Sequence, residues 1–220
     1  MESIGEGEMH EQVTHVAGRG AALYAPELTL GEARRLYFES NGFGEDGGYE
    51  ERWIKVKVWR LPVWLPNTEG RRKAVRLHDL HHIVTEYPTT WRGEAEISAW
   101  EIGGGGLRRY YAGWLLDLMN VAQGLLINPR GLYRAFMRGR RSKNLYSLEF
   151  TEELLAHRVG EFRERLLPAK EACARPSARD RAAFAFWALA GVASYFGALL
   201  AAFSPLLLLM LILLRARGLF

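Results

Sequence analysis

The chain has 220 residues, of which 49% are hydrophobic, and it carries a formal net charge of +4 at pH 7. That length is enough for one sizeable domain with a buried core. The single cysteine, Cys173, excludes an intrachain disulfide, and the mild positive charge is too weak to indicate a nucleic-acid-binding protein.

The pattern of composition predicts four stretches along the chain. Residues 1–22 are rich in glycine and glutamate, and they lack the basic and apolar runs of a signal peptide, so we expect a flexible start. Residues 23–168 have the periodicity of a mainly α domain. Residues 169–181 resemble a linker, and residues 182–214 form an apolar segment.

The first part of the domain predicts one helix and one small hairpin. Leu28–Asn41 has helical spacing with Thr29 as its cap, and Asn41-Gly42 marks a turn. Residues 53–59 alternate between two faces and residues 61–65 are extended between prolines, which predicts a β-hairpin near residues 53–65. The hairpin is either a lid over the helices or a pocket wall in which Trp59 and Trp64 hold a ring or prenyl chain.

The next helix, expected over residues 68–86, contains the densest cluster of metal-ligand side chains in the sequence. Because His78 and His82 are four residues apart, they lie on one helix face and can hold one divalent ion. Pro88 ends this helix near Glu86, and Thr89 or Thr90 can cap a second helix that carries Glu94.

If these two helices fold back on each other, the Glu94 carboxylate reaches the imidazoles of His78 and His82. Asp79 is then either a fourth ligand or a carboxylate that orients an imidazole. A histidine pair with this spacing is also common without a metal, so the pair alone does not specify one. We expect His81, Glu86 and Glu96 to be surface or supporting groups rather than ligands.

Three further stretches of the domain favour helices. Residues 107–126 carry a wide apolar stripe, residues 132–137 are amphipathic, and residues 150–167 begin with Thr151 as a cap. Two basic clusters stand out, at residues 71–76 and 138–143. Each cluster is either a solvated face or a contact for an anion. For residues 71–76 the anion would be a substrate carboxylate or a lipid phosphate, and for residues 138–143 it would be the membrane headgroups.

The C-terminal segment predicts a membrane attachment. Residues 182–214 contain no charged residue, and about 20 apolar residues suffice to span a bilayer. Ser204-Pro205 interrupts the segment, which indicates either one kinked span or a hydrophobic hairpin in one leaflet; a buried soluble hairpin is the alternative. Three arginines before the segment and two after it favour a domain that faces the cytoplasm, most simply at a bacterial inner membrane.

The motif H-D-x-x-H, followed after eleven residues by E, resembles the signature of the Coq-four family of ubiquinone biosynthesis proteins. The four positions are His78, Asp79, His82 and Glu94. The surroundings are also similar to bacterial members, with Pro66-Asn67 before the basic helix, the pair Gly93-Glu94 and the run from Trp100 to Ile102. The resemblance covers roughly residues 35–165. The C-terminal segment departs from the usual peripheral attachment of this family.

The resemblance implies a mainly helical fold and one divalent metal, usually zinc, held by His78, Asp79, His82 and Glu94. It implies metal-dependent decarboxylation and hydroxylation at C1 of a prenylated hydroxybenzoate precursor at the membrane. Expected partners are the prenylated precursor, membrane lipid, other quinone-biosynthesis proteins and a second copy of the chain. Two alternatives stay open: a non-catalytic lipid-binding scaffold for such enzymes, and a zincin-like metallohydrolase with Asp79 as its base.

Overall fold

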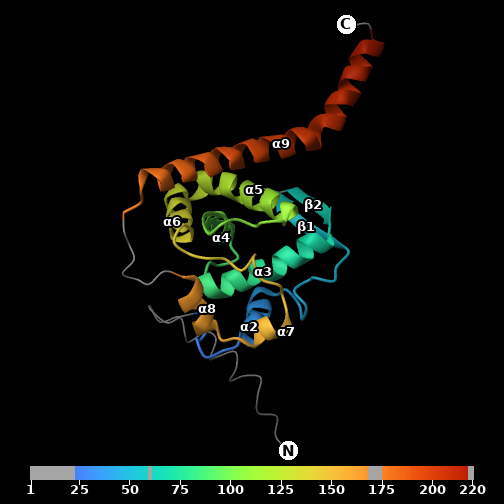
Figure 1. Cartoon of the computed structure of the whole chain (residues 1–220). Helices are drawn as coiled ribbons and strands as arrows, with labels where there is room; N and C mark the ends of the chain where they lie inside the picture. Colours follow the sequence, from blue (N-terminus) through green and yellow to red (C-terminus); the bar gives the residue numbers. More distant parts are fainter. Residues whose placement is uncertain (1–22, 59–60, 168–174, 218–220) are drawn as a thin grey trace, which may run out of the picture.

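The computed structural model describes residues 23–58, 61–167 and 175–217, so the predicted flexible start lies outside the described residues. Within these ranges the chain forms a mainly helical fold with one two-stranded sheet, which confirms the predicted fold class. Figure 1 shows the long C-terminal helix running across one side of the domain, with the shorter helices beneath it.

The first described helix, α2 (Leu30–Asn41), has the predicted bounds to within two residues. Thr29 and Glu32 form a capping box, in which each side chain accepts a hydrogen bond from the backbone of the other. The helix ends at Gly42, whose φ of 66° is the left-handed conformation that glycine adopts without strain. Local sequence signals therefore fix both ends of α2.

The predicted hairpin is confirmed by the antiparallel strands β1 (Trp53–Val58) and β2 (Leu61–Pro66). Their register pairs Trp53 with Pro66 and Val58 with Leu61. Trp64 is 61% exposed, and Trp59 lies outside the described residues. The exposure of Trp64 does not match the tryptophan-lined pocket that the sequence left open.

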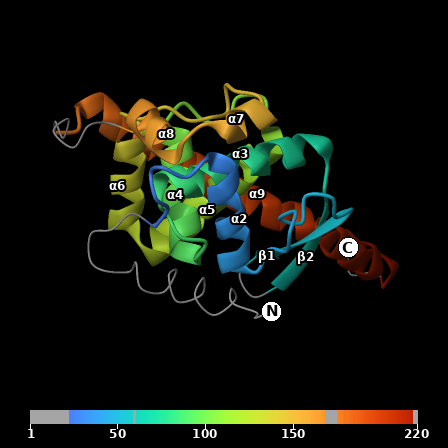
Figure 2. The ribbon, with the colours of Figure 1, turned by 90° about the horizontal axis from the view of Figure 1, so that it is seen from below.

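Two central helices carry the motif residues His78, Asp79, His82 and Glu94. Helix α3 (Glu69–Thr85) starts after its cap Thr68 and ends at Glu86, as predicted, and α4 (Trp91–Gly103) starts after its cap Thr90, one of the two predicted candidates. Figure 2 shows the molecule from below, with α2 and the hairpin near α3 and the C-terminal helix on the far side. The motif thus sits inside the helical domain rather than at its edge.

Helix α5 (Tyr111–Ile127) begins four residues later than the predicted start at Leu107. The delay has a backbone cause, because Gly105, Gly106 and Arg108 all have positive φ, which interrupts a right-handed helix. Leu107 is instead buried in the core. Helix α6 (Pro129–Gly139) follows directly, with its proline in the first turn, and extends the amphipathic stretch predicted at 132–137.

The helix predicted over residues 150–167 is wrong as one element, because the chain forms two short helices there. These are α7 (Glu152–Ala156), capped by Thr151 as predicted, and α8 (Val159–Leu166). The break arises because the carbonyl of His157 accepts a hydrogen bond from the N–H of Leu30, while Val159 donates to the carbonyl of Leu28. At this point the chain pairs with the residues at the start of α2 instead of continuing as one helix.

The last helix, α9 (Ala178–Ala216), contains Pro205 and includes the whole apolar segment predicted at 182–214. Its part Ala178–Leu206 is long and apolar enough to cross a membrane, by length and composition. Because α9 starts at Ala178, the linker predicted at 169–181 is shorter than expected at this end; residues 168–174 lie outside the described residues.

One hydrophobic core joins α2 to α8. It includes the fully buried side chains of Leu77, Leu80, Trp100, Leu132, Phe136 and Leu145. Helices α4 and α6 cross so closely that a Cβ on Gly139 would lie 2.2 Å from the carbonyl oxygen of Trp100. This tight crossing leaves α4 little freedom to move relative to the rest of the domain.

Candidate metal centre

The structure brings three of the four predicted site residues together. The Nε2 atoms of His78 and His82, one turn apart on α3, lie 3.1 Å from each other. The Glu94 carboxylate, from the first turn of α4, has one oxygen 3.4 Å from the Nε2 of His78 and the other 3.4 Å from that of His82. Three potential ligand groups, two imidazoles and one carboxylate, therefore converge.

The bend between α3 and α4 is what places Glu94 opposite the histidines. Its first residue, Glu86, has a φ of 63°, and its carboxylate is held by Arg163 at 2.7 Å. The chain then turns at Pro88 so tightly that a Cβ on Gly93 would lie only 1.9 Å from the Pro88 carbonyl oxygen. A glycine immediately before Glu94 is thus required by this bend.

Hydrogen bonds fix which nitrogen of each imidazole faces the centre. The Nδ1 of His82 lies 2.7 Å from the carbonyl oxygen of Tyr87, which can only accept, so Nδ1 carries the proton. The Nδ1 of His78 likewise donates to the Glu101 carboxylate at 3.0 Å. When each ring carries its single proton on Nδ1, the Nε2 lone pair points into the centre, which is the arrangement that metal-binding histidines adopt.

The centre is strongly negative. Burial disfavours a charged imidazolium at His78, but the carboxylates of Glu101 and Glu94 outweigh it and raise the pKa of His78 well above its ordinary value. Burial would likewise raise the pKa of Glu94, but hydrogen bonds with His78 and His82 outweigh it and hold that pKa well below its ordinary value. The potential that attracts a proton here also attracts a cation.

Glu101 is a buried carboxylate that the sequence did not identify as part of the site. One of its oxygens accepts hydrogen bonds from Nδ1 of His78, Nδ1 of His81 and the Tyr146 hydroxyl, the last at 3.0 Å. The N–H of Leu145 donates to Nε2 of His81 at 2.7 Å, which fixes the tautomer of that ring. Glu101 therefore orients one ligand directly and is itself held by two further donors.

Asp117, from α5, lies beside Glu101. The ligand atoms of His78, Glu101 and Asp117 lie within 4.8 Å of one another. Burial, followed by the charge of Glu101, raises the pKa of Asp117 well above its ordinary value. Asp117 is thus the carboxyl of this pair that favours its neutral form, so Glu101 remains the anion that faces His78.

Asp79 does not belong to either converging group of ligand atoms that the described residues form. It is buried on another side of α3, where it accepts hydrogen bonds from the hydroxyls of Tyr37 and Tyr49. The ring of Tyr37 also stacks on that of His82, with centroids 5.6 Å apart. The orienting role expected of Asp79 is thus taken by Glu101 and the Tyr87 carbonyl.

The geometry of the three converging residues fits a metal ion. In a tetrahedral zinc site with bonds of about 2.0–2.1 Å, neighbouring ligand atoms lie about 3.4 Å apart. The two Nε2 atoms are 3.1 Å apart, and each lies 3.4 Å from a different oxygen of Glu94, so the separations are close to that value. The side chains are unequally accessible, at 17% for His78, 1% for His82 and 30% for Glu94. The centre is therefore closed on the His82 side and open beside Glu94, where a substrate atom could approach.

A signal for Glu101 was present in the sequence. It follows Glu94 by seven residues, which is two helical turns on the same face of α4. His81 lies in the core and binds Glu101, as a supporting group, and Glu96 accepts hydrogen bonds from Arg92 and Asn128. The supporting role of His81 was among those expected, whereas its complete burial was not.

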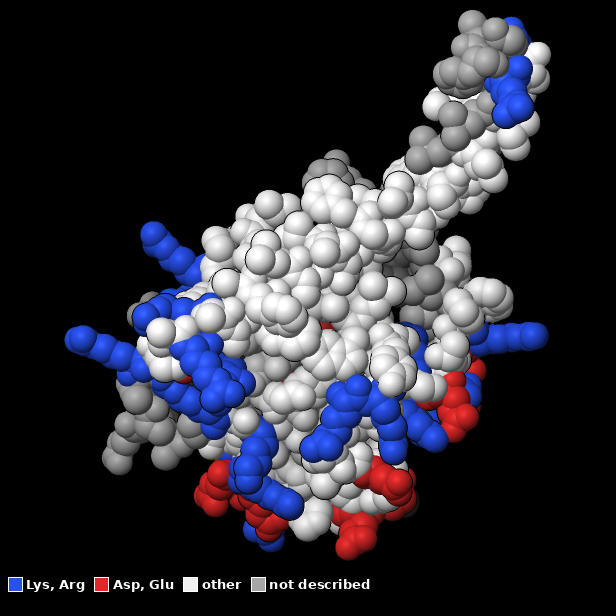
Figure 3. Space-filling view, turned by 45° about the horizontal axis from the view of Figure 1, so that its top comes forward, with Lys and Arg blue, Asp and Glu red and all other residues white. Residues whose placement is uncertain are grey.

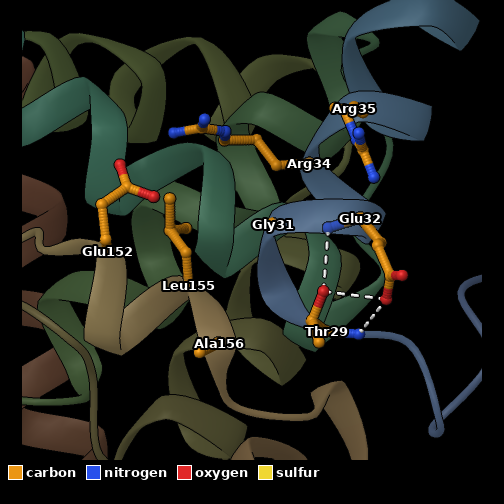
Figure 4. Close-up of a pocket in the computed structure, with 8 residues that line it drawn as sticks. All are labelled: Thr29, Gly31, Glu32, Arg34, Arg35, Glu152, Leu155 and Ala156. Atoms are coloured by element: carbon orange, nitrogen blue, oxygen red, sulfur yellow. Dashed lines mark hydrogen bonds between the residues drawn. The ribbon is translucent and has the colours of Figure 1, made fainter.

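A hollow elsewhere on the surface has a structural explanation. The pocket of about 330 Å³ between α2 and α7 is shallow and lined by Thr29, Gly31, Glu32, Arg34, Arg35, Glu152, Leu155 and Ala156. Figure 4 shows the polar groups of Thr29 and Glu32 occupied by the capping box of α2. This pocket contains none of the converging ligands, and we assign it no chemistry.

No known family model, no curated protein and no solved structure matches this chain. The geometry of the centre and the motif are therefore the observations that bear on function.

Proposed function

We propose that the centre between α3 and α4 binds one divalent metal ion through His78, His82 and Glu94. The observation that carries this proposal is the convergence of two Nε2 lone pairs and one carboxylate within 3.1–3.4 Å of one another. Two imidazoles and a carboxylate suit Zn²⁺ and Fe²⁺ alike. Zinc is the ion that the sequence resemblance implies.

The residues around the ligands would keep the centre rigid. Glu101 and the Tyr87 carbonyl hold the two imidazoles in the tautomers that a metal requires, and the bend at Gly93 holds the carboxylate. A bound divalent ion would supply Lewis acidity toward a phenolate or carboxylate oxygen of a substrate. The open side beside Glu94 leaves a position for that oxygen.

We further propose that the reaction is decarboxylation at C1 of a prenylated hydroxybenzoate, a step of ubiquinone biosynthesis. In that step the C1–carboxylate bond breaks, carbon dioxide leaves, and the bonding electron pair stays on the ring. The coupled hydroxylation at C1 needs an external two-electron oxidant that donates an oxygen atom. The motif supports this substrate, and the apolar helix α9 supports a location at the membrane where prenylated molecules reside, most simply a bacterial inner membrane with the domain in the cytoplasm.

Two other functions are weaker candidates. A metallohydrolase of the zincin kind needs Asp79 as a general base beside the metal, but both oxygens of Asp79 are bound by tyrosine hydroxyls instead. A lipid-binding scaffold that gathers other quinone-biosynthesis proteins, or pairs with a second copy of itself, needs only a structural metal. The accessible side of the centre at Glu94 favours catalysis over this scaffold.

Metal analysis of the purified full-length protein tests the centre. We expect one divalent ion per chain in the unmodified protein, loss of that ion in His82→Ala, and retention in His157→Ala, a matched change at an exposed histidine. Asp79→Asn should also retain the ion, because its side chain faces two tyrosines. Full metal content in His82→Ala would refute the ligand assignment, and metal loss in a folded Asp79→Asn variant would return Asp79 to the ligand set.

Release of labelled carbon dioxide from a carboxyl-labelled prenylated hydroxybenzoate tests the reaction. The metal-loaded protein, supplied with an oxidant, should release it, and the His82→Ala variant should not. A protein that holds the metal and binds the lipid without releasing carbon dioxide would instead be the scaffold.

A further inference from the structure

Helix α9 is attached to the domain along its first half rather than extending freely from it. The rings of Trp187 on α9 and Trp114 on α5 stack with centroids 5.0 Å apart, and Phe184 packs edge-on against Tyr133 of α6. At Gly191 the two backbones are so close that a Cβ would lie 2.7 Å from the Leu118 carbonyl oxygen. Figure 1 shows α9 following α5 across the domain.

The outward side of this α5–α9 layer is apolar and open. On α9 the exposed side chains include Phe186, Leu189, Phe196, Leu200 and Phe203, and on α5 they include Tyr111, Leu115, Leu126 and Ile127. Leu126 is 86% exposed and Tyr111 is 81% exposed. Figure 3 shows this face as a broad uncharged surface over α9. Soluble monomers rarely expose a continuous apolar surface of this kind.

Basic side chains border the layer. Exposed arginines lie just before α5, on α6 and at the start of α9, namely Arg108, Arg109, Arg130, Arg134, Arg179 and Arg181. In Figure 3 lysine and arginine side chains form the border of the uncharged surface, and most of the acidic ones lie beyond them. An apolar centre with a cationic rim complements a bilayer with anionic headgroups better than it complements a protein.

The geometry of α9 is unsuited to a membrane-spanning anchor. Its first half is held sideways against α5 by the stack of Trp187 on Trp114. Pro205 lies inside the continuous helix α9, and only residues 206–214 follow it before Arg215; nine residues of helix extend about 14 Å, half of the hydrocarbon thickness. While its first half keeps its contact with α5, α9 is therefore better placed to lie along the membrane than to cross it.

We infer that α5 and α9 together form a membrane-binding face that lies in one leaflet of an anionic bilayer, with both ends of α9 on the same side. This inference does not depend on the metal or its chemistry. It accounts for arginines on both flanks of the apolar segment, because a chain that never crosses keeps both flanks on the side that favours positive charge. Arg215 and Arg217 reach the headgroups through their long side chains.

The first test asks on which side of the bilayer the C-terminus lies. A double variant, Glu39→Cys with Arg217→Cys in a Cys173→Ser background, places one thiol on exposed α2 and one at the end of α9. The full chain is reconstituted into vesicles of equimolar phosphatidylcholine and phosphatidylglycerol and treated with a membrane-impermeant thiol reagent. Intact mass spectrometry should find molecules with two labels or none. Molecules with one label each would show a spanning helix and overturn the inference.

The second test asks whether α5 itself contacts lipid. An environment-sensitive fluorophore at Leu126→Cys should be quenched by brominated lipids several-fold more strongly than the same fluorophore at Glu39→Cys. Gly191→Leu should abolish that quenching while the protein still floats with vesicles, because it separates α9 from α5. Gly197→Leu is the matched control, since a Cβ there meets nothing within 4 Å, and it should preserve the quenching. Absence of quenching at residue 126 in the otherwise unmodified chain would overturn the inference.

Discussion

The centre between α3 and α4 buries charged groups, whereas the layer of α5 and α9 exposes apolar ones. In the centre, charged groups are buried and accept hydrogen bonds from the chain itself, as for the three donors that meet on one oxygen of Glu101. In the layer, apolar groups are left outside, with Leu126 and Phe186 more than half exposed. We propose that an ion completes the first region and that a lipid phase outside the protein completes the second.

The two regions therefore contribute differently to the free energy of folding. A buried carboxylate is stable only with its partners in place, so changes in the centre propagate to the whole domain. The outer face of the layer contributes little to folding in water, because its side chains remain in contact with solvent. The centre should therefore respond to substitution through stability and metal affinity, and the layer through membrane binding.

The largest expected effect is that of Glu101→Ala. The substitution leaves the Nδ1 groups of His78 and His81 and the hydroxyl of Tyr146 as buried donors without an acceptor. We expect a loss of about 3–5 kcal/mol in the free energy of unfolding, as for other broken buried ion pairs. Thermal unfolding of the full chain in detergent micelles, followed by circular dichroism, measures it.

Glu69→Ala is the matched control for that change. Glu69 also lies on a helix and pairs with a base, Lys73, at 2.6 Å, but both side chains are mostly exposed. An exposed ion pair contributes less than about 1 kcal/mol. Equal destabilisation by the two substitutions would contradict the distinction between a closed polar centre and a solvated surface.

Gly93→Ala should have the next largest effect, and it acts through geometry. Alanine favours helix over glycine by about 1 kcal/mol, but the new Cβ would lie 1.9 Å from the Pro88 carbonyl oxygen. The clash outweighs the propensity, so we expect the protein to lose about 1–3 kcal/mol of stability. Because Glu94 follows directly, the metal dissociation constant should rise about 10–100-fold, as for other losses of ligand positioning.

Competition with a metal chelator measures the affinity change. Gly70→Ala serves as the control, because a Cβ at that position of α3 meets nothing within 4 Å. It should raise stability by up to about 1 kcal/mol and leave metal affinity unchanged. A Gly93→Ala protein with unchanged affinity would mean that the bend does not position the Glu94 carboxylate.

Much of the fold follows from local signals in the sequence. Thr29, Thr90 and Thr151 each accept a backbone hydrogen bond at the start of the helix that they were predicted to cap, and Pro88 marks the bend. Two predicted helix boundaries were wrong, because non-local contacts or unusual backbone conformations determine where those helices begin and end. The break near His157 depends on pairing with α2, which is far away in the sequence, and the late start of α5 depends on positive φ values after Gly104.

The candidate site was predictable only in part for a similar reason. Spacing and the proline-marked bend suffice to bring His78, His82 and Glu94 together, because all three lie on adjacent elements. The hydroxyls that donate to Asp79 belong to Tyr37 and Tyr49. Both residues are far from the motif in the sequence, so its spacing does not predict this contact. No local pattern shows that these hydroxyls occupy its carboxylate while Glu101 takes over the orientation of His78.

The smallest expected effect compares two helix caps, one in each region. Thr90 caps α4 through the N–H of Gly93, and Ser177 caps α9 through the N–H of Asp180. Loss of a cap costs about 1 kcal/mol of helix stability. Thr90→Ala should lower the global free energy of unfolding by that amount, because α4 unfolds only with the core. Ser177→Ala should instead accelerate amide hydrogen exchange in the first turn of α9 and leave global unfolding unchanged, because that turn is exposed and can fray by itself.

If Ser177→Ala lowered the global free energy of unfolding as much as Thr90→Ala, α9 would be as integral to the folded domain as α4. The two regions would then be less independent than their contacts indicate.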